Sequence, residues 1–392
     1  MSVPELFTYS DAIDALEDFA RAHNASASQP QLRRAIQTAY REIATAHQWS
    51  FLKVFGRVML QASATVTASY DHTGGAYERL VTLTSGTFPT DAANYSIRIG
   101  NWVCDIEEYK TSTTATLDAT LNPGEDVASS ASCYLFPRYY LLPNDFMAMG
   151  QPHGDEDWYL GEYRSPDELN ELLHNDTTTG EIRYYSVGPA PDLYNTNVLY
   201  VWPPSDATEP LGFPYYRRPR PLRYSGKESA LDFGTGTVAV TSGSAAVAGT
   251  STAFESDMAG AIFRIGSSAT VAPTGMEGKQ PYAEQAAIKS VTSATALTLT
   301  GNIVTARSGK KYTISDPLDL DVAAYDAFLR CCEKHLANSM NFKDRVQVET
   351  AYRQSLAASK GADHRVRQRR VCGSPRIPWT RLADSTSRSE VE

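Results

Sequence analysis

The sequence has few cysteines and no long apolar run. Its 392 residues include five cysteines, an odd number, and no CxxC pair, so neither a disulfide framework nor a zinc site is predicted. We therefore expect the chain to fold in a reducing cytoplasm. No window approaches the roughly 18 consecutive apolar residues of a transmembrane helix. Residues 1–19 carry acids where a secretory signal needs a basic start, so neither membrane insertion nor secretion is expected.

The usual catalytic patterns are missing as well. HExxH, GxSxG, GxGxxG and GxxxxGK[ST] do not occur. One polar cluster, His153, Asp155 and Asp157, has the donor atoms to bind a divalent cation. Because these residues lack the spacing of an EF-hand, we interpret the segment as an exposed acidic loop. On predicted helices, His47 and His335 are interpreted as packing or surface histidines rather than bases, and Cys331 and Cys332 as core-filling residues. We predict no enzymatic activity, no catalytic residues, no cofactor and no metal.

Basic charge is scarce overall but gathers near the C-terminus. With 36 basic and 45 acidic residues the net charge is −9, which does not favour nucleic-acid binding over the whole surface. The basic tail has three possible roles: it is a docking peptide, a solvated terminus or a phosphate-binding arm. Docking is favoured because arginine and tryptophan are frequent interface anchors. The predicted docking residues are Arg365, Arg367, Arg369, Arg370, Arg376 and Trp379.

Both ends of the chain have helical periodicity. Residues 11–23 and 31–52 each have an apolar stripe, with Ser10 as a predicted N-cap. Near the other end, Asp316 and Pro317 predict the start of a helix. A second predicted helix follows it and ends near Gly361. The predicted packing seam consists of Val322, Tyr325, Leu329, Cys332 and Leu336. We expect residues 1–55 and 316–360 to form one helical domain, and residues 361–392 an extended docking tail.

The material between these helices is rich in strand signals. Residues 56–137 and 234–315 are predicted as β insertions, and residues 138–233 as a mixed β segment with a short helix at 166–174. The two insertions share an order of features, including Phe88 and Phe254 and the endings IRIG and FRIG. We interpret the second as a duplicate of the first, although small Thr-rich β modules often look alike. The predicted fold class is α+β: a helical bundle domain with inserted small β-sandwich or β-barrel-like domains.

Four segments carry a resemblance to known proteins, three of them to one family. AYREIATAHQWSFLKVFGRV (39–58) resembles the opening of head–tail adaptor (connector) proteins of tailed bacteriophages, including tubular adaptors. RYYLLPNDFMAMG (138–150) is similar to their LPxDF turn, and LYVWPPSDATEPLGFPYYRRPRPL (199–222) to their strand, PP turn and YxRRPxPL segment. The β module at 234–315 is similar to insertions common in phage structural proteins.

The resemblance implies a structural virion protein at the head–tail junction, assembled in the bacterial host cytoplasm. It implies a dodecameric ring of this chain, docked below the portal ring by its C-terminal segment, with tail or nozzle proteins bound beneath. Genomic DNA would pass through the lumen without specific binding. A glycan-binding host-recognition virion protein, using the 22 tyrosines, is the alternative. A polysaccharide-degrading enzyme would need a carboxylate pair, for which Asp155 and Asp157 are the only near candidates.

Overall fold

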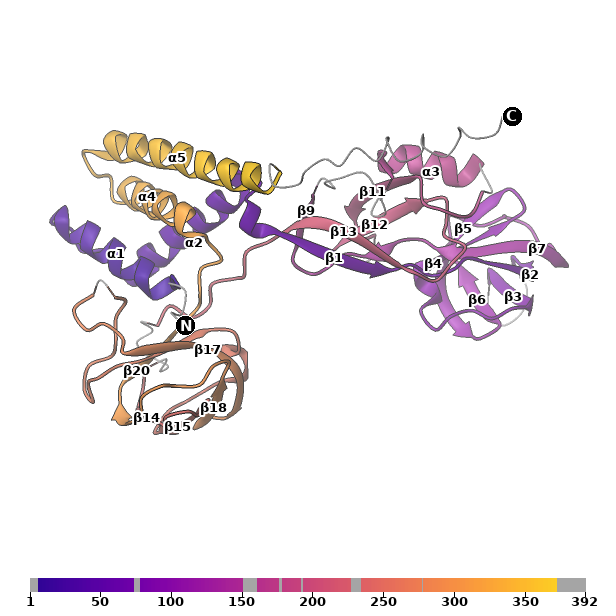
Figure 1. Cartoon of the computed structure of the whole chain (residues 1–392). Helices are drawn as coiled ribbons and strands as arrows, with labels where there is room; N and C mark the ends of the chain where they lie inside the picture. The colour runs from indigo at the N-terminus through magenta and orange to yellow at the C-terminus, as the bar shows by residue number, and fades with distance from the viewer. Residues whose placement is uncertain are drawn as a thin grey trace, which may run out of the picture. The chain divides into compact units, whose positions relative to one another are not determined.

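The chain divides into two compact units. The computed structural model describes residues 6–73, 78–150, 161–175, 178–191, 193–226, 234–276 and 278–371, with the backbone alone at 129–130, 174–175 and 366–371. Unit 1 combines Met1–Leu52 with Pro219–Glu392, and unit 2 is Lys53–Arg218 (Figure 1). The chain therefore leaves the first unit once, builds the second, and returns.

The predicted fold class is wrong. The described chain has twenty strands and only five α-helices, and it is mostly β rather than framed on a helical bundle. Six strands close into a barrel, seven form a second sheet, and two smaller sheets have three and four strands. The helical patterns at the two ends are real. The Thr- and Val-rich segments, however, bury complete cores of their own and make up the bulk of the fold rather than insertions.

Four helices of unit 1 pack together (Figure 1). They are α1 (Tyr9–Ala22), α2 (Gln29–Ala46), α4 (Val322–Ser339) and α5 (Arg345–Val371), with α4 packed on α1, α2 and α5. The N-cap of α1 is Thr8 rather than the predicted Ser10. Thr8 forms a capping box with Asp11, whose carboxylate accepts the Thr8 amide at 2.9 Å. The N-cap therefore lies two residues before the predicted one.

The start of α4 differs from the prediction. Its N-cap is Asp321 and not the predicted Asp316. The carboxylate of Asp316 instead accepts a hydrogen bond from the backbone amide of Tyr224 at 2.7 Å. Val322 is 62% exposed and lies outside the packed face, so the predicted seam is shifted. Tyr325 and Leu329 are half-buried. The buried face of α4 consists of Ala324, Ala327, Phe328, Cys331, Cys332, Leu336 and Ala337.

Helix α5 continues past Gly361 to Val371, so the first part of the predicted tail is helical rather than extended. A glycine inside a helix costs only about 1 kcal/mol relative to alanine. Contacts on both sides of Gly361 offset that cost. The Ser359 hydroxyl donates to the Ala323 carbonyl at 2.6 Å, and Asp363 accepts the Ser50 amide at 3.0 Å.

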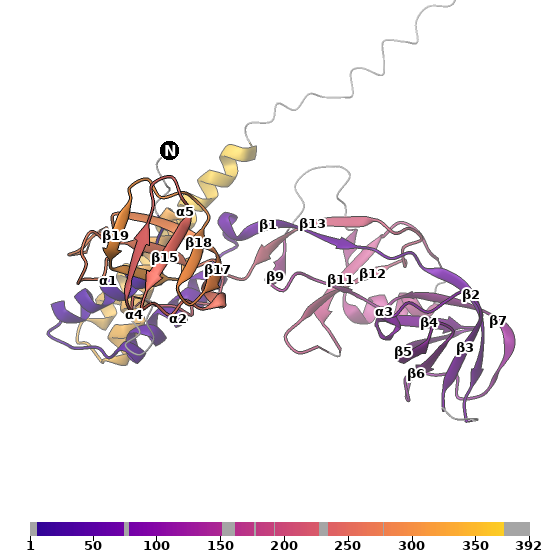
Figure 2. The same cartoon turned by 90° about the horizontal axis from the view of Figure 1, so that it is seen from below.

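Unit 2 contains a closed six-stranded barrel (Figure 2). The strands pair in the order β2-β3-β6-β5-β4-β7, and β7 closes the barrel by pairing with both β2 and β4. Alternating residues such as Val66, Ala68 and Tyr70 fill its interior. The strands are β2 (Ala64–Asp71), β3 (Leu80–Ser85), β4 (Tyr95–Ile99), β5 (Trp102–Thr111), β6 (Thr114–Leu117) and β7 (Val127–Pro137).

The seven-stranded sheet of unit 1 repeats this order of pairing. It runs β19-β14-β15-β18-β17-β16-β20, and its two end strands, β19 and β20, are separated only by Lys311. They therefore occupy together the place of β7 in the barrel, and the sheet curls so that its ends approach (Figure 2). The strands are β14 (Thr237–Val240), β15 (Ala246–Thr250), β16 (Ile262–Ile265), β17 (Glu284–Ser293), β18 (Ala296–Leu299), β19 (Arg307–Lys310) and β20 (Tyr312–Ser315).

Matching positions in the two β modules have matching environments. Phe88 and Phe254 are both buried in their cores, each just before a short 3-10 helix, η2 (Ala92–Asn94) or η3 (Ser256–Met258). Arg98 on β4 and Arg264 on β16 are both buried, at 9% and 3% exposure. This strand-by-strand correspondence is what a duplication predicts.

Two smaller sheets complete unit 2 and bring the family-like segments together. Phe146 of the LPNDF segment stacks on Tyr215 of the FPYYRR segment, and the Tyr215 hydroxyl donates to Asp145 at 2.7 Å. Helix α3 (Pro166–Asn175) begins with the predicted capping box, in which Ser165 and Glu168 exchange hydrogen bonds. The sheets are β1 (Lys53–Met59), β13 (Pro210–Arg217) and β9 (Phe146–Met149), and β10 (Glu162–Tyr163), β11 (Tyr184–Pro189), β12 (Asn197–Trp202) and β8 (Tyr140–Leu141).

Candidate functional site

The predicted docking arginines begin at the end of a long, anchored helix. Arg365 lies in the last turns of α5, and positions 367, 369 and 370 belong to the same helical backbone. Arg376 and Trp379 lie outside the described residues. Basic residues at a helix C-terminus complement the negative end of the helix dipole. The structure thus brings four of the six predicted residues onto one short stretch of helix.

A buried carboxylate fixes this part of α5. Asp363 is 6% exposed and accepts the Ser50 amide with one oxygen, while its other oxygen lies 3.0 Å from Nε2 of His47. His47 was predicted to be a packing or surface histidine, and its ring lies edge-on against that of Trp49 while Nε2 contacts Asp363. The anchor therefore ties α5 to the end of α2 directly before the arginine cluster.

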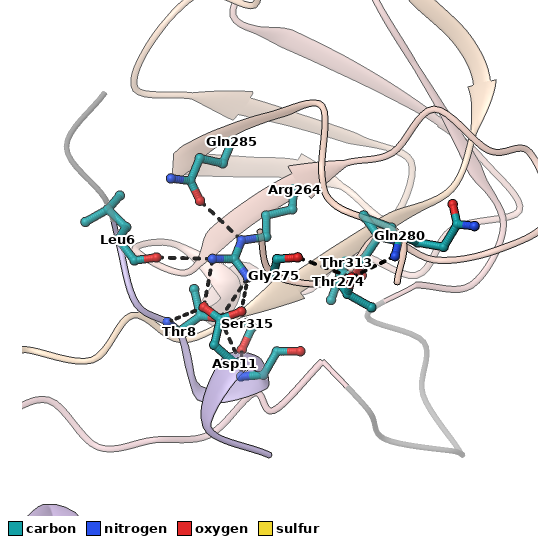
Figure 3. Close-up of polar contacts among 12 residues, drawn as sticks. Leu6, Thr8, Asp11, Arg264, Thr274, Gly275, Gln280, Gln285, Thr313 and Ser315 are labelled. Atoms are coloured by element: carbon teal, nitrogen blue, oxygen red, sulfur yellow. Dashed lines mark hydrogen bonds and ion pairs between the residues drawn. The ribbon is translucent and has the colours of Figure 1, made fainter. Parts of the chain in front are cut away.

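A buried arginine joins the second β module to α1 (Figure 3). Both amino groups of the Arg264 guanidinium contact the Asp11 carboxylate, at 2.6 and 2.9 Å. The same guanidinium donates to the Thr8 hydroxyl, the Leu6 carbonyl and the Gln285 side chain. Its planar fork matches a carboxylate in a bidentate pair, which a lysine cannot do. We call these contacts the Arg264 clamp.

A small pocket of about 120 Å³ opens beside the clamp. Asp11, Asp14 and Asp18 line it from α1, and the stacked rings of Phe7 and Tyr325 form part of its wall. Asp11 is already paired with Arg264, and Asp18 pairs with Arg21 on the helix surface. The pocket lies at the joint between α1 and the β module, and its described lining residues include no histidine, cysteine or serine.

The corresponding arginine of the first module also reaches a helix. Arg98 donates to the Leu173 carbonyl near the end of α3 in unit 2. The carbonyls of the last turn of a helix have no partner within the helix, so an external donor there stabilises the helix end. The sequence shows the arginine in both endings, IRIG and FRIG, but not what it binds.

A polar cluster lies among α2, α4 and α5 of unit 1. Lys334 donates to both oxygens of Glu42, at 2.6 and 2.8 Å, and Tyr352 donates to one of them at 2.9 Å. Nε2 of His335 lies 2.7 Å from the other oxygen. Burial opposes ionisation of Glu42, but these hydrogen bonds outweigh it and lower the pKa of the carboxyl to about 2. Glu42 is therefore charged at neutral pH.

The buried Cys331 thiol belongs to the same cluster. Its sulfur, a carboxylate oxygen of Glu42 and an imidazole nitrogen of His335 all lie within 4.8 Å of one another. Burial raises the pKa of Cys331 to about 12, so the thiol is protonated at neutral pH. From the sequence, Cys331 was interpreted as core filling and His335 as a packing or surface histidine, although their spacing of four on a helix places them on one face.

The structure describes some of the side chains considered for metal binding and for glycan stacking. The four cysteines with described side chains are all buried, and the candidate ligands His153, Asp155 and Asp157 lie outside the described residues. Of the tyrosine pairs, Tyr139–Tyr140 and Tyr215–Tyr216 are buried in unit 2, which indicates a structural role for them. No described helix combines the length and the apolar character needed to cross a lipid bilayer.

Comparison of the chain with models of protein families, with curated proteins and with solved structures finds no match. The predicted function therefore depends on the residues and their arrangement.

Proposed function

We propose that the chain is a structural head–tail adaptor of a tailed bacteriophage, which forms a ring below the portal. The observation that carries the proposal is the basic end of α5, which is anchored by Asp363 and leads into the segment with Arg376 and Trp379. A helix of 27 residues extends about 40 Å. Such a helix holds Arg365 and the backbone of the following turns at a fixed place relative to α2, and this lowers the entropic cost of docking.

The charge of the chain agrees with a DNA channel. A dodecameric ring would carry a formal charge of roughly −108, from −9 in each copy. An acidic lumen repels phosphates and lets DNA slide through instead of adhering to the wall. Below the ring, tail or nozzle proteins are the proposed partners. An adaptor acts by binding and sealing, so it needs no catalytic group or cofactor.

The first test is the native mass of the full chain, alone and mixed with the portal ring encoded by the same genome. We expect a portal complex that carries about a dozen copies, as the family resemblance implies. No association, together with a free trimer that binds glycans, would contradict the adaptor proposal and favour host recognition.

A second test concerns the docking residues. Truncation after His364 removes the arginines but keeps the Ser359 and Asp363 contacts that hold α5. We expect the truncated chain to fold and to lose portal binding. The matched control is Arg353→Glu, which reverses a charge that is 75% exposed on the same helix and outside the cluster. Normal portal binding by the truncated chain would show that the docking assignment is wrong.

A further inference from the structure

The Glu42–Cys331–His335 cluster contains a sulfur, a nitrogen and an oxygen donor on two facing helices. Cys331 and His335 are four residues apart on α4, and Glu42 projects from α2. Cys331 is fully buried, while the side chains of His335 and Glu42 are 24% and 34% exposed. The sulfur side of the cluster is therefore closed by protein, whereas the imidazole and the carboxylate are partly exposed to solvent.

We propose that these three residues bind a thiophilic divalent cation of the Zn²⁺ class. Zinc takes cysteine sulfur at about 2.3 Å and imidazole nitrogen or carboxylate oxygen at about 2.0–2.2 Å. In a tetrahedral site these bond lengths place N and O about 3.3 Å apart, and S about 3.6 Å from either. The present N to O distance is 2.7 Å and no donor pair exceeds 4.8 Å, so small side-chain rotations are enough. Water would take the fourth position.

The ammonium of Lys334 shows that the cluster already stabilises a cation. It contacts both oxygens of Glu42 and lies 4.4 Å from the centre of the Tyr352 ring. Metal entry exchanges this cation for another. The metal brings two positive charges, the Cys331 thiol releases one proton to solvent, and the Lys334 ammonium swings outward. The net charge of the site is unchanged, so the exchange leaves no uncompensated charge among the helices.

The neighbouring Cys332 provides a matched control. It is as deeply buried as Cys331 on the same helix. Among the residues that the structure describes, the only metal-compatible group of three donors contains Cys331 and not Cys332. A thiol-dependent signal that follows Cys331 alone therefore reports this site and not cysteine chemistry in general.

The test is a titration of the metal-free full chain with Co²⁺, a spectroscopic substitute for Zn²⁺, followed by competition with Zn²⁺. We expect a sulfur-to-cobalt charge-transfer band that saturates at one equivalent and is abolished by excess Zn²⁺. Cys332→Ser should keep the band, whereas Cys331→Ser and Glu42→Gln should lose it. Lys334→Met should bind the metal more tightly because the competing ammonium is gone.

The absence of a band in the wild-type chain, or a band that survives in Cys331→Ser, would overturn the proposal. If Cys331→Ser does not fold, His335→Gln takes its place, because that ring is partly exposed and its loss leaves the core intact. A retained band of unchanged affinity in a folded His335→Gln chain would equally overturn the site. Portal binding plays no part in this measurement, so its outcome is independent of the adaptor proposal.

Discussion

Replacement of Arg264 by methionine should loosen the start of α1. The substitution keeps much of the side-chain volume but leaves the Asp11 carboxylate without its bidentate partner. Removal of one partner of a buried ion pair costs about 3–5 kcal/mol. Asp11 is 15% exposed and still accepts hydrogen bonds from Thr8, so we expect a value near the lower end, about 3 kcal/mol.

Hydrogen exchange of the α1 backbone measures this loss directly. If the free energy of local opening of α1 falls by about 3 kcal/mol, its amides should exchange roughly a hundredfold faster, since each 1.36 kcal/mol is a factor of ten. The amides of Tyr9–Ala22 should respond, whereas those of the barrel in unit 2 should not. Local exchange is preferable to a single unfolding midpoint because a chain of two units need not unfold in one step.

The matched control is Arg223→Met. Arg223 lies 3.5 Å from Asp257, and the two side chains are 59% and 52% exposed, so its loss should cost less than about 1 kcal/mol. The double variant Asp11→Asn with Arg264→Met should cost less than the two single changes together. Each single change leaves one buried charge without its partner, whereas the double variant removes both charges. If Arg264→Met accelerates exchange in α1 no more than Arg223→Met does, the Arg264 clamp does not hold the helix.

Three other predictions concern single side chains. Ser165→Ala removes one half of the α3 capping box and should destabilise that helix by about 1 kcal/mol, seen as faster exchange there; unchanged exchange would contradict the cap. The pKa of Glu42 is about 2 against an ordinary 4.5, so its stabilising contribution is complete above about pH 4.5 and is lost as the pH falls toward 2. Urea midpoints measured against pH should show this acid loss in the wild type but not in Glu42→Gln; identical profiles would argue against it. Phe88→Ala and Phe254→Ala should each cost about 3–5 kcal/mol within their own β module, and a large effect at only one would weaken the equivalence of the two.

The fold class shows where sequence patterns mislead. The helical periodicity at both ends was strong, and it suggested a helical frame with insertions. Yet each β segment buries its own core, from Val66 to Leu135 in one and from Val238 to Ile314 in the other. The shift of the α4 seam has a similar cause. Val322 fits the apolar repeat, but it lies in the first turn, where no neighbouring helix covers it and 62% of it is exposed.

The sequence by itself determined what depends on near neighbours. The Ser165 cap, the apolar stripes of α1 and α2 and the β character of the two Thr-rich segments all follow from residues a few positions apart. Tertiary structure alone decided which distant groups meet. Arg264 and Asp11 are 253 positions apart, and Glu42 and His335 are 293 apart. No local propensity encodes such pairs, because their partners lie on either side of unit 2 in the sequence and meet only through the packing of unit 1.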